Sequence, residues 1–165
     1  MREHPIRNIL LLSFAILLSA CAGGPKFSTE DIDTTFTPKQ AVSEAASQKG
    51  KQVLWGGMII NSTNLENETR IEVLAYPLDS DHYPQTDSAP YGRFMLFREG
   101  YLETVDYAPG RLLSVVGRFD GTLDGKVGES EYTYPVIRAE QLHLWSQGGR
   151  RSPNLHFGIG VIFSN

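Results

Sequence analysis

The sequence predicts an all-β protein with one short N-terminal helix, folded as a small OB-like barrel of five to six strands. From Lys51 onward, short runs of β-branched and aromatic residues are separated by Gly, Pro, Asn and Asp, the usual pattern of strands and turns. Several runs are apolar at both alternating positions, so both faces of those strands need cover. Glycines stand inside such runs at Gly56, Gly57 and Gly117, where they suit the bends of a closed barrel.

Residues 1–20 have the features of a bacterial lipoprotein signal peptide. Two arginines precede an apolar run from Ile9 to Leu18, and small residues follow it. The run is too short to cross a hydrocarbon core of about 30 Å, which needs about 20 helical residues. We therefore expect cleavage between Ala20 and Cys21, and lipidation of the Cys21 thiol.

Cys21 also predicts where the protein resides. Several acyl chains hold a protein stably on a membrane, at about 0.8 kcal/mol per buried methylene. Ala22 stands where lipoproteins retained in the inner membrane commonly carry aspartate, so we expect an outer-membrane anchor with the domain facing the periplasm. Cys21 is the single cysteine of the chain, which excludes an intramolecular disulfide.

The charge of the chain argues against a nucleic-acid partner. The formal net charge is −4 for the whole sequence, and removal of residues 1–20, with two arginines and one glutamate, changes it to −5. A phosphate backbone requires a basic surface, which such a chain does not offer. The remaining length suits one domain.

Residues 21–36 are rich in Gly, Ser, Thr and acidic side chains without periodicity, which indicates a flexible tether. The predicted domain spans residues 37–145 and begins with a short helix. Thr37 is its expected N-cap, Gln40 the capping-box partner and Gly50 the stop. Because the apolar face of this helix is narrow, we expect it to dock on the barrel as a lid.

Five strands are expected after the helix. Their predicted ranges are Val53–Asn61, Thr69–Tyr76, Gly92–Phe97, Arg111–Phe119 and Tyr134–Leu144. The segment Asp120–Gly125 resembles a calcium loop but lacks oxygen ligands at alternate positions. Its glycines instead predict a hairpin turn.

Residues 146–165 are predicted to be a polar linker followed by a C-terminal strand. Apolar side chains alternate between Leu155 and Phe163, which is the period of a strand with one apolar face. Two interpretations remain open: a sixth or edge strand within the domain, or a strand that pairs with an envelope protein. A lone strand cannot span lipid, because its backbone would stay unpaired.

Several short segments follow one another between Leu18 and Trp145 in a distinctive order. They are Leu18–Cys21, Trp55–Gly57, Ile60–Asn61, Asn64, Thr69–Val73, Tyr76–Asp79, Gly92–Phe94, Gly100–Leu102, Gly110–Leu112, Val116–Gly117, Gly125–Gly128, Tyr132–Pro135 and Leu144–Trp145. In these segments the chain resembles the Slp family of outer-membrane lipoproteins, the starvation-inducible lipoprotein and its relatives. The resemblance implies a lipidated protein of the cell envelope.

Three residues are candidates for a binding site. Trp55, like Trp145, is either an exposed aromatic platform or, in the favoured interpretation, a partly buried residue that closes the barrel and whose indole N–H finds a backbone acceptor. Glu72 and Arg93 are either a pair that orients a ligand or, as we favour, a structural ion pair or unrelated solvated charges.

No catalytic residue, metal site or cofactor is predicted. Catalysis needs a nucleophile with a base, a spaced carboxylate pair or an open metal site, and the sequence contains no such pattern. His82, His143 and His156 lie far apart along the chain. The segment from Asp79 to Asp87 offers oxygen and imidazole ligands, but its spacing matches no established metal site, so it reads as a polar loop. We therefore expect a protein that is not an enzyme.

Together these observations predict an outer-membrane-anchored lipoprotein whose periplasmic β domain acts in envelope maintenance or stress adaptation, by binding or scaffolding. The expected partners are outer-membrane lipid, through acylated Cys21, and an envelope protein, through the C-terminal strand. The alternative is a module that binds a small ligand or a cation, and a hydrolase ranks third. A concave pocket with converging polar groups would favour the ligand-binding alternative.

Overall fold

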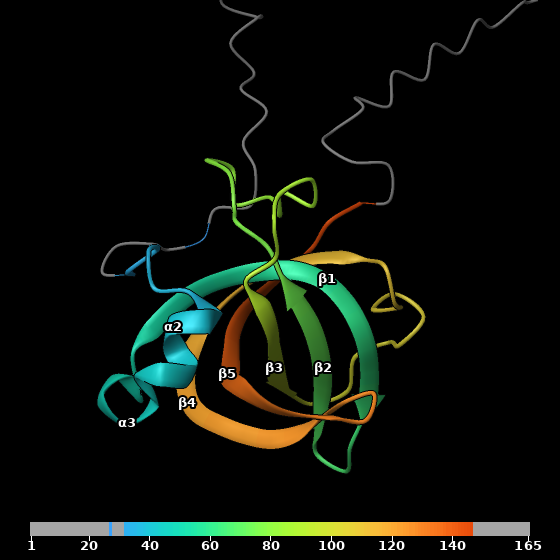
Figure 1. Ribbon diagram of the computed structural model, residues 1–165. Helices are drawn as coiled ribbons and strands as arrows, with labels where there is room; N and C mark the ends of the chain where they lie inside the picture. Colours follow the sequence, from blue (N-terminus) through green and yellow to red (C-terminus); the bar gives the residue numbers. More distant parts are fainter. Residues whose placement is uncertain (1–26, 28–31, 147–165) are drawn as a thin grey trace, which may run out of the picture.

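The computed structural model of the chain describes residue 27 and residues 32–146 (Figure 1). The predicted signal peptide, the lipidation site Cys21 and the predicted C-terminal strand lie outside the described residues. No helix within the described ranges is long and apolar enough to cross a membrane.

Two short helices and five strands make up the described chain. They are α2 (Pro38–Ser43), α3 (Ala45–Gln48), β1 (Gln52–Asn64), β2 (Glu68–Ala75), β3 (Gly92–Glu99), β4 (Leu112–Val127) and β5 (Ser130–Leu144). The strands close into a barrel in the order β1-β2-β3-β5-β4, and β4 pairs back onto β1. All neighbouring pairs are antiparallel except β3 and β5. The predicted fold class is confirmed, with five strands forming the ring.

Strand β1 takes part in both sides of the ring because it bends in its middle. Its first half pairs with β4 and its second half with β2, and Gly57 pairs with both Leu113 and Ala75. A Cβ atom on Gly57 would collide with the backbone carbonyl of Leu74, and one on Gly56 would lie 2.7 Å from the carbonyl oxygen of Leu113. The predicted role of this glycine pair, a bend that no larger residue permits, is confirmed.

The inward side chains of the five strands form one apolar core. Alternate residues are fully buried along β2, where Ile71 and Val73 face inward while Glu72 is partly exposed. This period of two is what a strand with one buried face requires. The largest fully buried side chains of this core include Phe94, Phe119 and Ile59.

The second half of β4 differs from the prediction. The expected hairpin turn at Asp120–Gly125 is wrong, because these residues continue β4 and pair with β5. Gly121, with φ +101°, marks a bulge where the register shifts. The turn lies at Gly128 and Glu129, between the paired residues Val127 and Ser130. A glycine in a left-handed conformation therefore marks a bulge in one place and a turn in the other.

The predicted helix is confirmed in place and capping but is broken in two. The Thr37 side chain accepts a hydrogen bond from the Gln40 backbone, and the Gln40 side chain accepts one from the Thr37 backbone, which completes the capping box. Helix α2 ends at its C-cap Glu44, where α3 begins. Helix α2 contacts β3, β4 and β5, and its Ala41 is buried in the core, so the expected docking on the barrel is confirmed (Figure 1).

Residues 32–36 belong to the packed domain, although they were predicted to end a flexible tether. Phe36 is buried in the core cluster, with its ring 6.1 Å from that of Phe119 and 6.4 Å from that of Trp55. We call residues 32–37 the strap. The tether was predicted to end at residue 36 from the composition of the segment. Burial of the Phe36 side chain stabilises the packing of the strap on the barrel, and composition does not reveal this burial.

Candidate functional site

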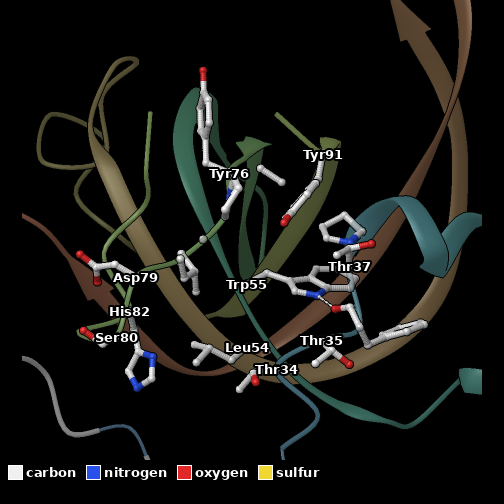
Figure 2. A pocket seen from close by; sticks show the side chains of 16 residues that line it. Thr34, Thr35, Thr37, Leu54, Trp55, Tyr76, Asp79, Ser80, His82 and Tyr91 are labelled. Carbon is white, nitrogen blue, oxygen red and sulfur yellow. Dashed lines mark hydrogen bonds between the residues drawn. The ribbon is translucent and has the colours of Figure 1, made fainter. Parts of the chain in front are cut away.

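A pocket of about 520 Å³ lies at one end of the barrel. We call it the rim pocket. Three segments line it: the strap with the start of α2, the first half of β1, and the connection between β2 and β3 (Figure 2). Its lining residues are Thr34, Thr35, Phe36, Thr37, Pro38, Leu54, Trp55, Gly56, Ala75, Tyr76, Pro77, Leu78, Asp79, Ser80, His82 and Tyr91.

Trp55 forms the inner wall of the rim pocket and joins it to the core. Its side chain is 3% exposed, and its indole N–H donates a 2.7 Å hydrogen bond to the Phe36 carbonyl (Figure 2). Its ring lies 5.3 Å from that of Phe94. The predicted backbone acceptor is confirmed for Trp55, and its burial is more complete than the partial burial that was predicted. Trp145 differs, because its indole N–H donates to the Ser114 hydroxyl at 3.0 Å rather than to the backbone.

The strap is tied to the barrel by one ion pair as well as by Phe36. Lys51 Nζ lies 2.9 Å from Asp33 Oδ2, and the Thr35 hydroxyl and backbone N–H both donate to Asp33 Oδ1. The hydrogen bonds from Thr35, followed by the one from Lys51, lower the pKa of the Asp33 carboxyl well below its usual range. Asp33 therefore organises the strap beside the pocket.

The connection between β2 and β3 forms the opposite wall. The backbone N–H of Tyr76 donates to the Gly56 carbonyl at 3.0 Å, and that of Tyr91 to the Ala75 carbonyl at 2.9 Å. These bonds hold the two ends of the connection against the sheet. Figure 2 shows the Tyr91 hydroxyl directed into the space above Trp55, whereas the Tyr76 ring points away from it.

The middle of this connection is a structured polar loop. Asp79 Oδ1 accepts hydrogen bonds from the backbone N–H groups of Asp81 and Tyr83. His82 adopts a left-handed φ of 64°. Its carbonyl oxygen accepts a 2.5 Å hydrogen bond from the hydroxyl of buried Ser114. Within residues 32–146 no three His, Cys, Asp or Glu side chains are grouped to hold a metal ion. The loop shapes one wall of the rim pocket.

Charge is sparse in the rim pocket. Among the lining residues within the described part of the chain, Asp79 is the single carboxylate and His82 the single imidazole, and there is no lysine or arginine. The remaining polar groups are hydroxyls from threonine, serine and tyrosine, and the apolar floor comes from Leu54, Trp55 and Ala75. The arrangement can receive an uncharged ligand with both polar and apolar faces.

The other two candidates, Glu72 and Arg93, lie together on the outer wall of the barrel. Arg93 Nη1 is 2.6 Å from Glu72 Oε1, and the Tyr134 hydroxyl lies 3.2 Å from the same oxygen. The bond to Glu72 raises the pKa of the Arg93 guanidinium, while burial and the Glu72 charge raise the pKa of Tyr134. The shift of the Arg93 pKa has the sign expected for a guanidinium paired with a carboxylate.

The structure thus brings Glu72 and Arg93 together and leaves Trp55 apart from them. Glu72 and Tyr134 line a second, smaller pocket of about 220 Å³, which shares no residue with the rim pocket. Sequence reasoning did not select Tyr91 or the strap threonines. No local pattern singles them out, because they meet Trp55 only after the barrel closes.

The histidines within the described residues, His82 and His143, do not form a pair. The His143 ring packs on Trp145 with 4.5 Å between centroids, and burial lowers its pKa. His82 lines the rim pocket and lies 5.8 Å from the Phe27 ring. His156 lies outside the described residues.

Comparison with known proteins adds a family to this geometry. Residues 18–159 match the family described as "Outer membrane lipoprotein Slp family". The lipoprotein YeaY of Escherichia coli K12, itself uncharacterized, is 30% identical over 148 residues, which cover 87% of this chain and 75% of that protein. An uncharacterized protein of Haemophilus influenzae is 31% identical, with 78% and 70% covered. The outer membrane protein Slp of Escherichia coli is 25% identical, with 84% and 74% covered.

Solved structures similar to this chain include two single-stranded DNA-binding proteins. Rim1, from the mitochondria of S. cerevisiae, is 13% identical with a TM-score of 0.38, covering 61% of this chain and 99% of Rim1. The small protein from Streptomyces coelicolor is 19% identical with a TM-score of 0.38, covering 58% of this chain and 94% of that one.

Proposed function

The chain belongs to the outer membrane lipoprotein Slp family, and from this premise we propose that its barrel domain, held at the outer membrane, acts in envelope maintenance or stress adaptation by binding. The lipid anchor is Cys21, which becomes the first residue after cleavage at Ala20. The domain faces the periplasm. The proposal assigns no reaction to the domain.

The observation that supports binding is the rim pocket. A cavity of about 520 Å³ with converging hydroxyls is the feature that the ligand-binding alternative requires, and its size lies in the range of pockets that enclose small molecules. The barrel behind it is closed and packed, so the wall of the pocket is held rigid. A cation is a poorer ligand for this pocket, because Asp79 is its single carboxylate and already accepts two backbone hydrogen bonds.

The anchor and the pocket are close along the chain. The Phe27 ring lies 5.8 Å from His82 at the rim pocket, and six residue steps separate Phe27 from Cys21. A fully extended chain of that length spans roughly 20 Å. The proposed lipid anchor therefore keeps the rim pocket near the membrane surface.

Lipidation is tested with Cys21→Ser. We expect the variant to incorporate no palmitate and to leave the outer-membrane fraction, because serine offers no thiol for thioether formation. Metabolic labelling with palmitate and density-gradient fractionation provide the measurement. Ala22→Asp is the matched control: it should be labelled like the parent chain but move toward the inner membrane. Equal labelling of Cys21→Ser and the parent chain would contradict the anchor.

Scaffolding through the C-terminal strand is tested separately. Crosslinking in intact cells, with the parent chain and with Ser152–Asn165 deleted, identifies what the domain contacts. Loss of crosslinked proteins from a deletion variant that still melts near the parent temperature supports a partner on this strand. An unchanged set of partners leaves the binding role to the barrel.

A further inference from the structure

We propose that the rim pocket binds a neutral saccharide, with the Tyr91 ring stacked on the apolar face of one sugar ring. This inference rests on the proposed binding function and names its ligand class.

The charge of the pocket lining favours an uncharged ligand. Among residue 27 and residues 32–146, those that line the rim pocket include no lysine and no arginine. An anionic ligand, such as a phosphorylated lipid headgroup or a nucleotide, would lose hydration there without a cation to replace it, which disfavours its binding. Asp79 is the single carboxylate, and its Oδ1 already accepts hydrogen bonds from two backbone N–H groups of the loop. The ligand that fits such a lining is uncharged.

The lining of the rim pocket contains both polar and apolar groups. The hydroxyl side chains of Thr34 and Ser80 line the rim pocket together with the apolar side chains of Leu54 and Ala75. An alkyl chain would strip water from these hydroxyls and supply no hydrogen bond in return. A pyranose ring presents hydroxyls around its edge and C–H groups on its faces. It therefore matches both halves of the lining, and aromatic rings accept its C–H groups through weak contacts.

Tyr91 provides an exposed aromatic ring in the rim pocket. Its side chain is 37% exposed, whereas Trp55 beneath it is almost wholly buried, so Tyr91 is the ring that a ligand meets. The hydrogen bond from the Tyr91 backbone N–H to the Ala75 carbonyl fixes its Cα against β2. The Tyr91 hydroxyl extends into the space above Trp55 (Figure 2). A tyrosine provides a large contact surface at a low entropic cost, because it has only two side-chain torsions.

The test is titration of the full-length lipidated protein, held in nanodiscs of phosphatidylcholine. The probes are two neutral oligosaccharides, the tetramers of N-acetylglucosamine and of glucose in α-1,4 linkage, and the readout is calorimetry with saturation-transfer NMR. We expect at least one tetramer to bind. Tyr91→Ala should weaken that binding by about tenfold, while Tyr91→Phe, which keeps the ring, should stay within about threefold of the parent chain.

Tyr101→Ala is the matched control, because Tyr101 is also an exposed tyrosine, at 69%, but does not line the rim pocket. Its affinity should equal that of the parent chain. Near-UV circular dichroism of each variant separates lost contacts from lost folding, and Tyr91→Phe keeps the test valid even where Tyr91→Ala unfolds.

Two results would overturn the saccharide proposal. One is the absence of binding by both tetramers at millimolar concentration. The other is tight binding of laurate or of a sugar phosphate that Tyr91→Ala abolishes, which would assign the pocket to an acyl chain or an anion. Neither result changes palmitate labelling or fractionation, so failure of this inference is distinguishable from failure of the lipoprotein assignment.

Discussion

The interior of the barrel and the rim pocket are built in different ways. The interior holds side chains such as Phe94, Phe119 and Ile71, which are fully buried. The rim pocket is lined by hydroxyls and by the partly exposed ring of Tyr91. Trp55 belongs to both regions, with its ring in the core and its indole N–H bonded to the strap.

This difference separates stability from binding. Burial of a large apolar side chain stabilises a fold by about 1.5–3 kcal/mol, whereas hydroxyls that stay in contact with water contribute little. Substitutions in the interior should therefore unfold the domain, and substitutions at the rim should change ligand affinity in a domain that stays folded. Three predictions, given from the largest effect to the smallest, test where this division holds.

The largest effect is expected for Gly57→Val. The new side chain would begin at a Cβ that collides with the Leu74 backbone carbonyl, and a backbone group cannot move aside without breaking the pairing of β1 with β2. We expect the free energy of unfolding to fall by at least about 3 kcal/mol. Urea unfolding of the full chain, followed by tryptophan fluorescence, measures the change.

Met58→Val is the control for Gly57→Val. It places the same β-branched residue one position further along β1, at a partly exposed site. We expect a change of less than about 1 kcal/mol there. A Gly57→Val variant that is as stable as the parent chain would refute the bent-strand account of barrel closure.

An intermediate effect is expected for Phe36→Ala, because Phe36 is the part of the strap that belongs to the interior. Loss of this buried ring should destabilise the domain by about 3 kcal/mol and detach the wall of the rim pocket that the strap provides. Hydrogen exchange at the strap amides and urea unfolding together measure both effects. Val42→Ala, an exposed change on α2, should alter neither. Fast exchange at the strap with unchanged global stability would show that Phe36 belongs to the rim instead.

The smallest effect is expected for Asp33→Asn, at the exposed tie between strap and barrel. The folded-state pKa of Asp33 is lowered by its bonds from Thr35 and Lys51. Its stabilising contribution is therefore present above the unfolded-state pKa of about 3.9 and is lost as the pH falls through the folded-state value. The parent chain should be slightly more stable than Asp33→Asn at pH 6, and this difference should begin to narrow once the pH falls below the unfolded-state pKa. Unfolding curves from pH 6 to pH 3 check this, and a constant difference over the range would argue against the ion pair.

Local patterns predicted most of the barrel. The apolar residues around Ile71 and Val73 marked a strand, although cover was expected on both faces and β2 buries only one. The spacing of Thr37 and Gln40 marked the capping box, because that motif depends on residues a few positions apart. The glycines were harder to interpret. The sequence predicted a turn at Gly121, whereas the structure has a β-bulge there in the pairing of β4 with β5. That pairing joins residues too far apart along the chain for a short stretch of sequence to reveal it.

Local sequence patterns were enough to predict the strands and the capped helix, since side-chain periodicity and capping are local properties. For Trp55 they only favoured partial burial over an exposed platform. Only the tertiary structure decided which residues meet at the rim. Thr35, Trp55 and Tyr91 lie in three separate segments, and their convergence follows from the order in which the strands close and from the insertion of Phe36. A pocket depends on how segments far apart along the chain are placed relative to one another. That placement is set by the packing of the whole core.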